Sequence, residues 1–376
     1  MSDKKVRCWG EDAQGALGRG PRVSNDGGGD TDAPDADPPV AEVAGLANVS
    51  QVSAGGTTTC ARLDDGSVHC WGGNELGQLG LTTDPPTSDS EAHSTPSAVA
   101  LPGAASRVDV GPSGACALLA ADDVVCWGAN DQAQLAREGT SAIGGPEKAN
   151  LRGAKLARVA PSMHTSFAVD DRGRLMSWGA MNGAAGCVSG RAASVTPDPI
   201  PELLALDQVT GVAVSSWQSY FPDWSSPEQG LAHACAIARG SVYCWGASLR
   251  GALGLGVPFP FVGPTRAGVQ GKVYPQRVAV SMESTCLRMT NGTLQCAGDD
   301  SFGQLGRGAA AGLFSDVFTP ATALTEYALR IALSDQTTCA IVRGGKVWCW
   351  GGNASGGLGL GTTDDERHPV PSLVGL

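Results

Sequence analysis

The chain has 376 residues, 53 of them glycine, and a formal net charge of −11 at pH 7. This negative balance disfavours nucleic acid or an anionic membrane as a partner, because both would be repelled over a broad surface. No apolar run reaches the roughly 18 residues that a spanning helix needs, so we expect no membrane insertion.

One segment, typified by Val68–Gly80, recurs seven times along the chain. Its copies cover residues 6–18, 68–80, 124–136, 175–186, 242–254, 294–306 and 347–359. Repeats laid end to end at such a period are typical of one closed or stacked assembly. We therefore predict a single domain over 1–376, with units at about 1–47 (partial), 48–104, 105–155, 156–207, 208–271, 272–326 and 327–376.

Each full unit contains four runs with the composition and alternation of β-strands. In the unit 48–104 these runs are 49–53, 57–63, 67–71 and 96–101, separated by glycine-rich turns. Four antiparallel strands make one blade of a β-propeller. The sequence therefore predicts an all-β fold.

The first two strands of the unit occur six times and the last two occur seven times, because the chain opens directly on a third strand at 6–10. We predict a seven-bladed β-propeller of four-stranded antiparallel blades in which one blade lacks its inner pair of strands. The alternative is a six-bladed ring with a loose N-terminal hairpin. The missing pair leads us to expect about 25 further residues before Met1 in the natural protein.

Ten of the twelve cysteines form pairs that flank a predicted hairpin turn. The pairs are Cys60/Cys70, Cys116/Cys126, Cys235/Cys244, Cys286/Cys296 and Cys339/Cys349. A spacing of ten with a three-residue loop, or of nine with a two-residue loop, places both cysteines opposite each other on neighbouring strands. We interpret them as cross-strand disulfides, with Cys8 and Cys187 unpaired; the alternative is that they are free thiols acting as small buried apolar residues.

Five disulfides persist only in an oxidising compartment, so we expect a periplasmic, cell-surface or secreted protein. Zinc is disfavoured because no closely spaced cysteine pair of the usual zinc-binding kind occurs. We expect no metal and no cofactor.

The best copies of the repeat, at 57–80 and 339–359, end a hairpin on Trp-Gly and continue with Asn-x-x-Gly. They resemble the repeats of the regulator of chromosome condensation family, a resemblance that extends over nearly the whole chain and implies a seven-bladed propeller. That family includes exchange factors for small GTPases, a plant ultraviolet receptor and a secreted β-lactamase inhibitory protein, so the resemblance does not fix a function. The paired cysteines suit a bacterial secreted branch, and the receptor's Gly-Trp-Arg-His-Thr motif is absent.

The unit 208–271 carries extra aromatic residues in its loops, away from any core period. They are Trp217, Tyr220, Phe221, Trp224, Phe259 and Phe261. Aromatic side chains on exposed loops are the anchors that protein interfaces favour, so we predict that these six bind a partner protein. The alternative is that the loop folds back and plugs the rim or the central channel. The tryptophans of the Trp-Gly pairs recur once per unit and are expected to pack between blades.

No nucleophile elbow, phosphate loop or zinc-protease motif occurs, and His233 and His164 fall at positions that favour a structural role. We therefore predict a monomeric, non-enzymatic module that binds a still unknown protein. The alternatives are a guanine-nucleotide exchange factor for a small GTPase and a propeller lyase or hydrolase.

Overall fold

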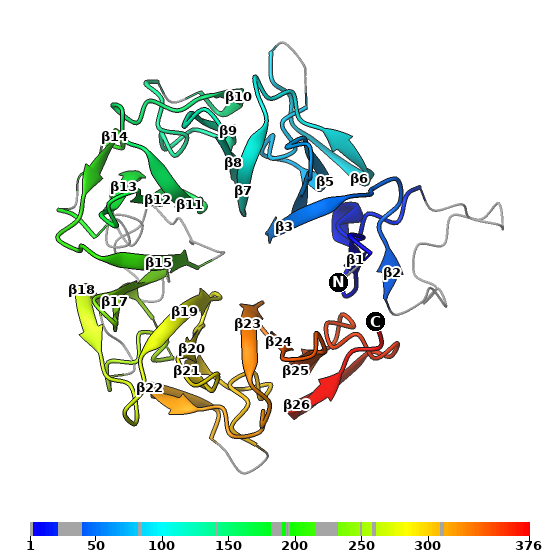
Figure 1. Ribbon diagram of the computed structural model, residues 1–376, viewed down its shortest axis with the longest axis vertical. Helices are drawn as coiled ribbons and strands as arrows, with labels where there is room; N and C mark the ends of the chain where they lie inside the picture. The colour runs from blue at the N-terminus through cyan, green and yellow to red at the C-terminus, as the bar shows by residue number, and fades with distance from the viewer. Residues whose placement is uncertain are drawn as a thin grey trace.

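The computed structural model describes residues 3–21, 40–81, 85–139, 141–181, 190–192, 194, 196–215, 232–248, 250–257, 261–308 and 312–376. In these residues the chain forms six four-stranded antiparallel sheets and one two-stranded sheet, arranged around a ring (Figure 1). No described helix has the length and hydropathy needed to span a membrane.

Each four-stranded sheet is one blade, whose strands run in chain order from the centre of the ring to its rim (Figure 1). Blade 1 contains β3 (Val49–Gly55), β4 (Thr58–Leu63), β5 (Val68–Asn74) and β6 (Asp89–Ala98), and blade 2 contains β7 (Ala105–Gly111), β8 (Gly114–Leu119), β9 (Val124–Ala129) and β10 (Ile143–Lys148). Blade 3 contains β11 (Leu156–Ala160), β12 (Thr165–Asp170), β13 (Leu175–Gly179) and β14 (Asp198–Leu203), and blade 4 contains β15 (Val209–Val214), β16 (His233–Ala238), β17 (Ser241–Ala247) and β18 (Phe261–Ala267). Blade 5 contains β19 (Pro275–Val280), β20 (Ser284–Met289), β21 (Leu294–Asp299) and β22 (Phe314–Pro320), and blade 6 contains β23 (Ala328–Leu333), β24 (Thr337–Val342), β25 (Val347–Asn353) and β26 (Asp364–Leu373).

The two-stranded sheet is an N-terminal pair, β1 (Arg7–Cys8) with β2 (Ala41–Glu42), and a short 3-10 turn, η1 (Ala13–Gly15), follows β1. The pair lies between blade 6 and blade 1 and occupies the seventh sector of the ring (Figure 1). The structure thus has six complete blades plus an N-terminal hairpin, which is the geometry predicted as the alternative to a seven-bladed ring. The hairpin is not loose, because hydrogen bonds hold it to both neighbours.

Those hydrogen bonds belong to a series in which a tryptophan indole joins successive sectors of the ring. The Nε1–H of each tryptophan donates to a backbone carbonyl in the loop of the preceding sector, at 2.8–3.0 Å. The pairs are Trp71 with Ala16, Trp127 with Gln78, Trp178 with Gln134, Trp350 with Gln304, and Trp9 with Gly357. The prediction that the Trp-Gly tryptophans pack between blades is therefore confirmed for these five residues.

The Gly of the Trp-Gly pair has a backbone that only glycine tolerates well. At Gly72 the φ angle is 106°, and an added Cβ would overlap the carbonyl oxygen of Thr57, the residue just before β4. The Trp-Gly motif therefore meets two local requirements. The tryptophan supplies an indole that reaches the preceding loop, and the glycine allows two backbones to approach closely.

Blade 5 lacks the tryptophan, since Ala297 stands at its position, and the space is filled from another strand. Phe318, on the outer strand β22, is fully buried and packs with Leu253 and Ala297. A side chain at Gly254 would overlap the Phe318 ring, just as one at Gly80 would crowd Trp127. Phe318 therefore takes the place of the missing indole between blades 4 and 5.

The five predicted cysteine pairs are bonded: Cys60–Cys70, Cys116–Cys126, Cys235–Cys244, Cys286–Cys296 and Cys339–Cys349. Each joins the two middle strands of a blade at directly opposed positions, including the pair with a spacing of nine. Cys8 is free and half-buried, and Cys187 lies outside the described residues.

Among the described residues the seventh sector has no inner strands, and apolar side chains of both neighbouring blades are exposed there. Val52 on β3 is 46% exposed, whereas Val108, at the same position of blade 2, is fully buried. On the other side, Ile341 of blade 6 is 38% exposed, whereas Ile237 of blade 4 is 2% exposed. In the described part of the chain, no strand therefore lies between β23 and β3 on the inner side of the ring.

Candidate interaction surface

The strands alternate in direction, so the connections between the first and second strands and between the third and fourth strands of every blade emerge on one face. We call this the long-loop face, because connections such as 75–88 and 300–313 lie on it. The tight hairpins between the second and third strands lie on the opposite face.

The predicted partner-binding residues fall mostly where the structure gives no description. Trp217, Tyr220, Phe221, Trp224 and Phe259 lie outside the described residues. The backbone of Phe261 begins β18 and pairs with Ala247, but its side chain is also outside the description. Their role in binding therefore stays a prediction.

The described residues contain a group of exposed apolar side chains where blades 4 and 5 meet. We call it the blade 4–5 patch; its members are Val257, Leu313, Phe314 and Val317, between 40% and 58% exposed. The two blades meet here, since Leu255 forms an isolated β-bridge with Val317 and the N–H of Gly256 donates to the carbonyl of Asp316 at 2.8 Å. Clustered apolar exposure of this kind is typical of interaction sites.

The sequence alone does not reveal this patch, because its members come from two repeat units: Val257 follows β17 in blade 4, whereas Leu313, Phe314 and Val317 lie just before or within β22 in blade 5. The one signal available was Leu313-Phe314, two adjacent large apolar residues at the end of a loop rich in alanine and glycine. Only the pairing of the two blades places Val257 and Val317 near them.

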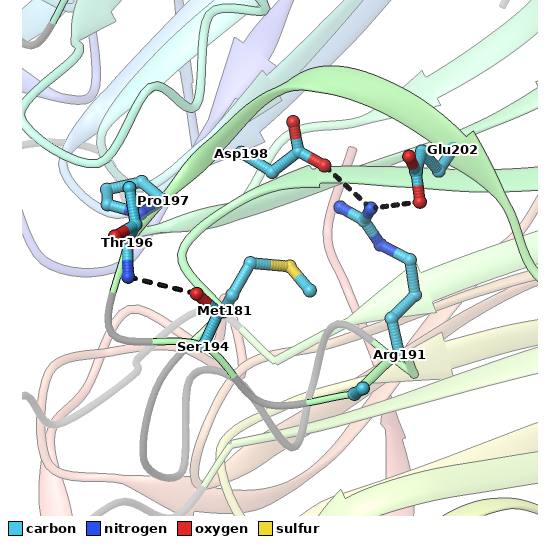
Figure 2. Close-up of a pocket in the computed structure, with 8 residues that line it drawn as sticks. Met181, Arg191, Ser194, Thr196, Pro197, Asp198 and Glu202 are labelled. Carbon is cyan, nitrogen blue, oxygen red and sulfur yellow. Dashed lines mark hydrogen bonds and ion pairs between the residues drawn. The ribbon is translucent and has the colours of Figure 1, made fainter.

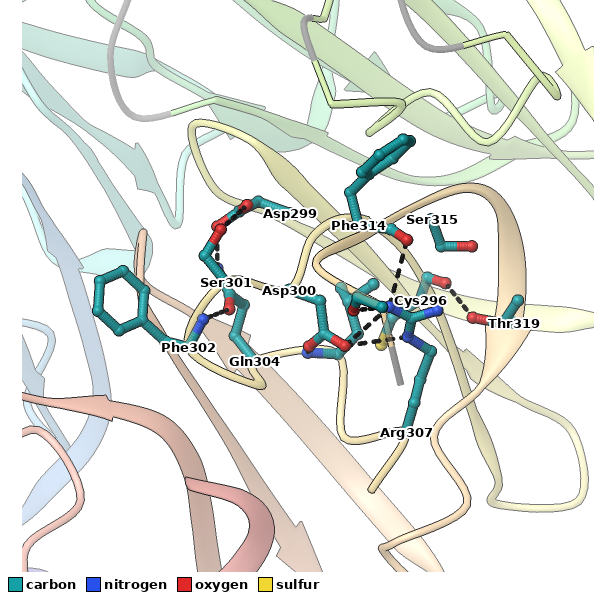
Figure 3. Close-up of polar contacts among 12 residues, drawn as sticks. Cys296, Asp299, Asp300, Ser301, Phe302, Gln304, Arg307, Phe314, Ser315 and Thr319 are labelled. Atoms are coloured by element: carbon teal, nitrogen blue, oxygen red, sulfur yellow. Dashed lines mark hydrogen bonds and ion pairs between the residues drawn. The ribbon is translucent and has the colours of Figure 1, made fainter. Parts of the chain in front are cut away.

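A buried carboxylate, Asp300, is linked through Arg307 to the backbone of Phe314 (Figure 3). Asp300 is fully buried; its side chain receives the N–H of Leu305 at 2.9 Å and pairs with Arg307 at 2.9 Å and with Arg367 of blade 6 at 3.3 Å. Burial raises the pKa of Asp300, while the backbone donor and the two guanidinium groups oppose that rise. Arg307 also donates to the carbonyls of Gly312 and Phe314 at 2.7 and 3.2 Å, so the ion pair fixes the backbone that presents Phe314.

A second polar group ties blade 4 to blade 5 on the same face. The Arg250 guanidinium lies 3.0 Å from Asp299, 3.5 Å from Glu283 and 3.2 Å from the Ser301 hydroxyl. Burial, together with the neighbouring Asp299 charge, raises the pKa of Glu283. The loops around the patch are therefore joined by ion pairs across three blades.

Blade 3 carries a hollow of about 330 Å³ on the same face (Figure 2). Arg191 crosses it and pairs with Asp198 at 2.9 Å and Glu202 at 3.0 Å, and Met181 and Pro197 line its other side. Two carboxylates already match the guanidinium charge, so this arrangement explains how the loop is held and does not point to a ligand.

His233, which we assigned a structural role, is fully buried at the start of β16. Its Nε2 lies 2.9 Å from the Thr285 hydroxyl of blade 5, and burial lowers its pKa to about 4. His164 also has a pKa lowered by burial. In the described part of the chain, no group of three or more histidine, cysteine or carboxylate side chains is placed to hold a metal ion.

Curated relatives match much of this chain. Probable E3 ubiquitin-protein ligase HERC6 of Homo sapiens is 30% identical over 268 residues, which cover 69% of this chain and 25% of that protein. Ultraviolet-B receptor UVR8 of Arabidopsis thaliana is 28% identical over 331 residues, covering 85% of this chain and 68% of the receptor. The chain therefore spans about a quarter of the first relative and about two thirds of the second.

Solved structures show the same fold. Prp20p of Saccharomyces cerevisiae superposes with a TM-score of 0.79 at 18% identity, covering 100% of this chain and 87% of Prp20p. Human WBSCR16 superposes with a TM-score of 0.77 at 20% identity, covering 100% of this chain and 94% of that one.

Antiparallel four-stranded blades, arranged in a ring and linked by tryptophan-to-carbonyl hydrogen bonds, define a β-propeller repeat protein. The family described as Regulator of chromosome condensation (RCC1) repeat matches residues 49–78 and 330–356 in one form and 65–118 and 344–375 in another. The chain belongs to this repeat family.

Proposed function

We propose that this chain is a non-enzymatic, monomeric protein-interaction module that binds its partner through the long-loop face. The observation that carries the proposal is the blade 4–5 patch, in which Leu313 and Phe314 are exposed although ion pairs hold their backbone in place. A preorganised apolar surface loses little conformational entropy on binding, and exposed aromatic side chains are frequent anchors of interfaces. The predicted aromatic residues within 217–224 and 259–261 belong to the same repeat unit as Val257 of this patch.

The comparisons support a binding role. Prp20p is described with binding properties to Gsp1p and histones, and the same yeast protein is known in complex with Kap60. We extend to this chain only the general capacity of such a propeller to bind proteins. Guanine-nucleotide exchange remains the second candidate; a nucleotide-release assay with a small GTPase tests it directly.

We further propose that the module acts outside the reducing cytosol, in the periplasm, at the cell surface or after secretion. Five cross-strand disulfides support this proposal, because such bonds are rare where glutathione keeps thiols reduced. Alkylation of the denatured, unreduced protein followed by intact mass should count two free thiols, Cys8 and Cys187. A count of twelve would contradict the proposal.

The binding surface is tested by capture on the immobilised protein from the extracytoplasmic fraction of the source cells. Phe314→Ser and Trp217→Ala/Trp224→Ala should each lose a partner that the wild-type chain retains, with an unchanged melting temperature. Val370→Ser is the matched control, since Val370 is an apolar residue on the outer strand of blade 6 that is 56% exposed, against 47% for Phe314. Equal capture by all variants would place the binding surface elsewhere.

A further inference from the structure

Arginine recurs at one position of the innermost strands. Arg107, Arg158, Arg277 and Arg330 each lie opposite the corresponding residue of the second strand, namely Leu118, Val169, Arg288 and Ile341. Gln51 and Gly211 occupy the same position in blades 1 and 4. The innermost strands surround the centre of the ring (Figure 1), so four of the six blades carry an arginine at the same level of the strand that borders the central channel.

These guanidinium groups are close enough to repel one another. Burial lowers the pKa of Arg158, and the charges of Arg107 and Arg277 lower it further, against the opposing charge of Asp109. Burial likewise lowers the pKa of Arg277, with added contributions from Arg330, Arg288 and Arg107. The positive charges of blades 2, 3, 5 and 6 therefore act on each other across the channel.

Few carboxylates of the described residues lie near these arginines. Asp109 pairs with Arg107 through two hydrogen bonds of 2.6 Å and also accepts the N–H of Val159. In the described part of the chain, no carboxylate lies within 4.0 Å of the guanidinium groups of Arg158, Arg277 or Arg330. Among the described residues, the four channel arginines thus exceed their one carboxylate partner by three charges, although the whole chain has a net charge of −11.

The channel also offers space beside these charges. A cavity of about 200 Å³ is lined by Arg107, Asp109 and Arg158, together with Ser53 and Val212 of the flanking blades. Guanidinium groups bind phosphate oxygens through two parallel hydrogen bonds, and such pairs are stronger where water is partly excluded. A ligand that spans several arginines must carry several negative charges.

We propose that the central channel binds a small polyvalent oxyanion of the polyphosphate class in the cavity beside Arg158, with Arg277 and Arg330 of blades 5 and 6 supplying further positive charge. The site lies toward the hairpin face, because each arginine pairs with a residue near the hairpin end of the second strand. It is therefore separate from the blade 4–5 patch on the long-loop face and does not depend on the proposed partner binding.

The test is calorimetric titration of the full chain with tripolyphosphate at constant ionic strength. The variant is Arg277→Gln/Arg330→Gln, which removes two charges but keeps hydrogen-bonding side chains. The control is Arg239→Gln/Arg266→Gln, which removes two exposed arginines outside the channel. We expect the channel variant to bind at least about tenfold more weakly than wild type, and the control to bind within about twofold of it.

Melting temperature provides a second readout. Tripolyphosphate should raise the melting temperature of the wild type and the control but not of the channel variant, because a ligand stabilises the state that binds it. At low salt and without ligand, the channel variant should melt at or above the wild type, since two repelling charges are gone. If the double variant does not fold, Arg330→Gln alone, at an exposed position, takes its place. Equal affinity in the channel variant and the control, or no binding to wild type, would overturn the proposal.

Discussion

The indole Nε1–H of Trp9 donates to the carbonyl oxygen of Gly357 at 3.0 Å, although the two residues are 348 positions apart in the chain. Trp71 of blade 1 makes the same contact to Ala16, on the other side of the N-terminal pair. Both sides of this short sheet are thus held by the same tryptophan-to-carbonyl hydrogen bond that joins the complete blades. The two-stranded pair therefore closes the outer part of the ring.

Trp9→Phe tests this closure. Phenylalanine keeps an aromatic side chain but lacks the indole N–H that donates to the Gly357 carbonyl. We expect the free energy of unfolding to fall by about 1 kcal/mol. Trp348→Phe is the matched control, since the Trp348 Nε1 has no hydrogen-bond partner among the described residues. Urea denaturation of both variants checks the difference; equal losses would show that the Trp9 hydrogen bond contributes nothing specific.

Phe318 should be among the side chains whose truncation costs most, because it fills the space that an indole fills elsewhere in the ring. Phe318→Ala is expected to lower the free energy of unfolding by about 3–5 kcal/mol. Phe314→Ala, four residues away on the same strand but exposed, should cost less than about 0.5 kcal/mol. Thermal denaturation compares the two, and similar melting temperatures would contradict the role given to Phe318.

Because the described residues place no inner strand in the seventh sector, valines at equivalent positions of blades 1 and 2 differ in burial. Val108→Ala removes fully buried methyl groups and should cost roughly 2 kcal/mol, whereas Val52→Ala should cost less than about 1 kcal/mol because Val52 is nearly half exposed. Chemical denaturation of both variants measures this difference. Equal costs would mean that the sector between β23 and β3 is filled in solution.

Much of the fold could be predicted because its signals are local and repeated. The spacing of Cys60 and Cys70 fixes their cross-strand register, and Trp71-Gly72 marks the end of a hairpin, so each unit reports its own strands. The role of Phe318 could not be predicted, because Phe318 lies on β22 whereas the tryptophan that it replaces belongs to β21. Only the packing between blades 4 and 5 shows that Phe318 fills the space of the indole.

The candidate sites were less accessible to sequence reasoning for two different reasons. Exposure of Val257 and Phe314 depends on how neighbouring loops are placed, which no pattern within one unit records. The channel arginines did leave a signal: Arg followed by Val or Ile occurs at 107, 158, 277 and 330. That these arginines come close together becomes apparent only when the innermost strands are arranged around one axis.

Acid should destabilise the protein partly through His233. Its pKa is about 4 in the folded state and about 6.5 when unfolded, so the unfolded chain binds the proton first as pH falls. The stability contributed by neutral His233 is complete above pH 6.5 and is lost progressively between pH 6.5 and 4, by up to about 3 kcal/mol. His164, whose pKa is also lowered by burial, acts in the same direction.

Replacement of His233 by Gln should therefore flatten, but not abolish, the fall in the free energy of unfolding between pH 7 and 4.5. Urea denaturation across that range measures the slope, and identical slopes for His233→Gln and wild type would show that His233 does not titrate differently on folding.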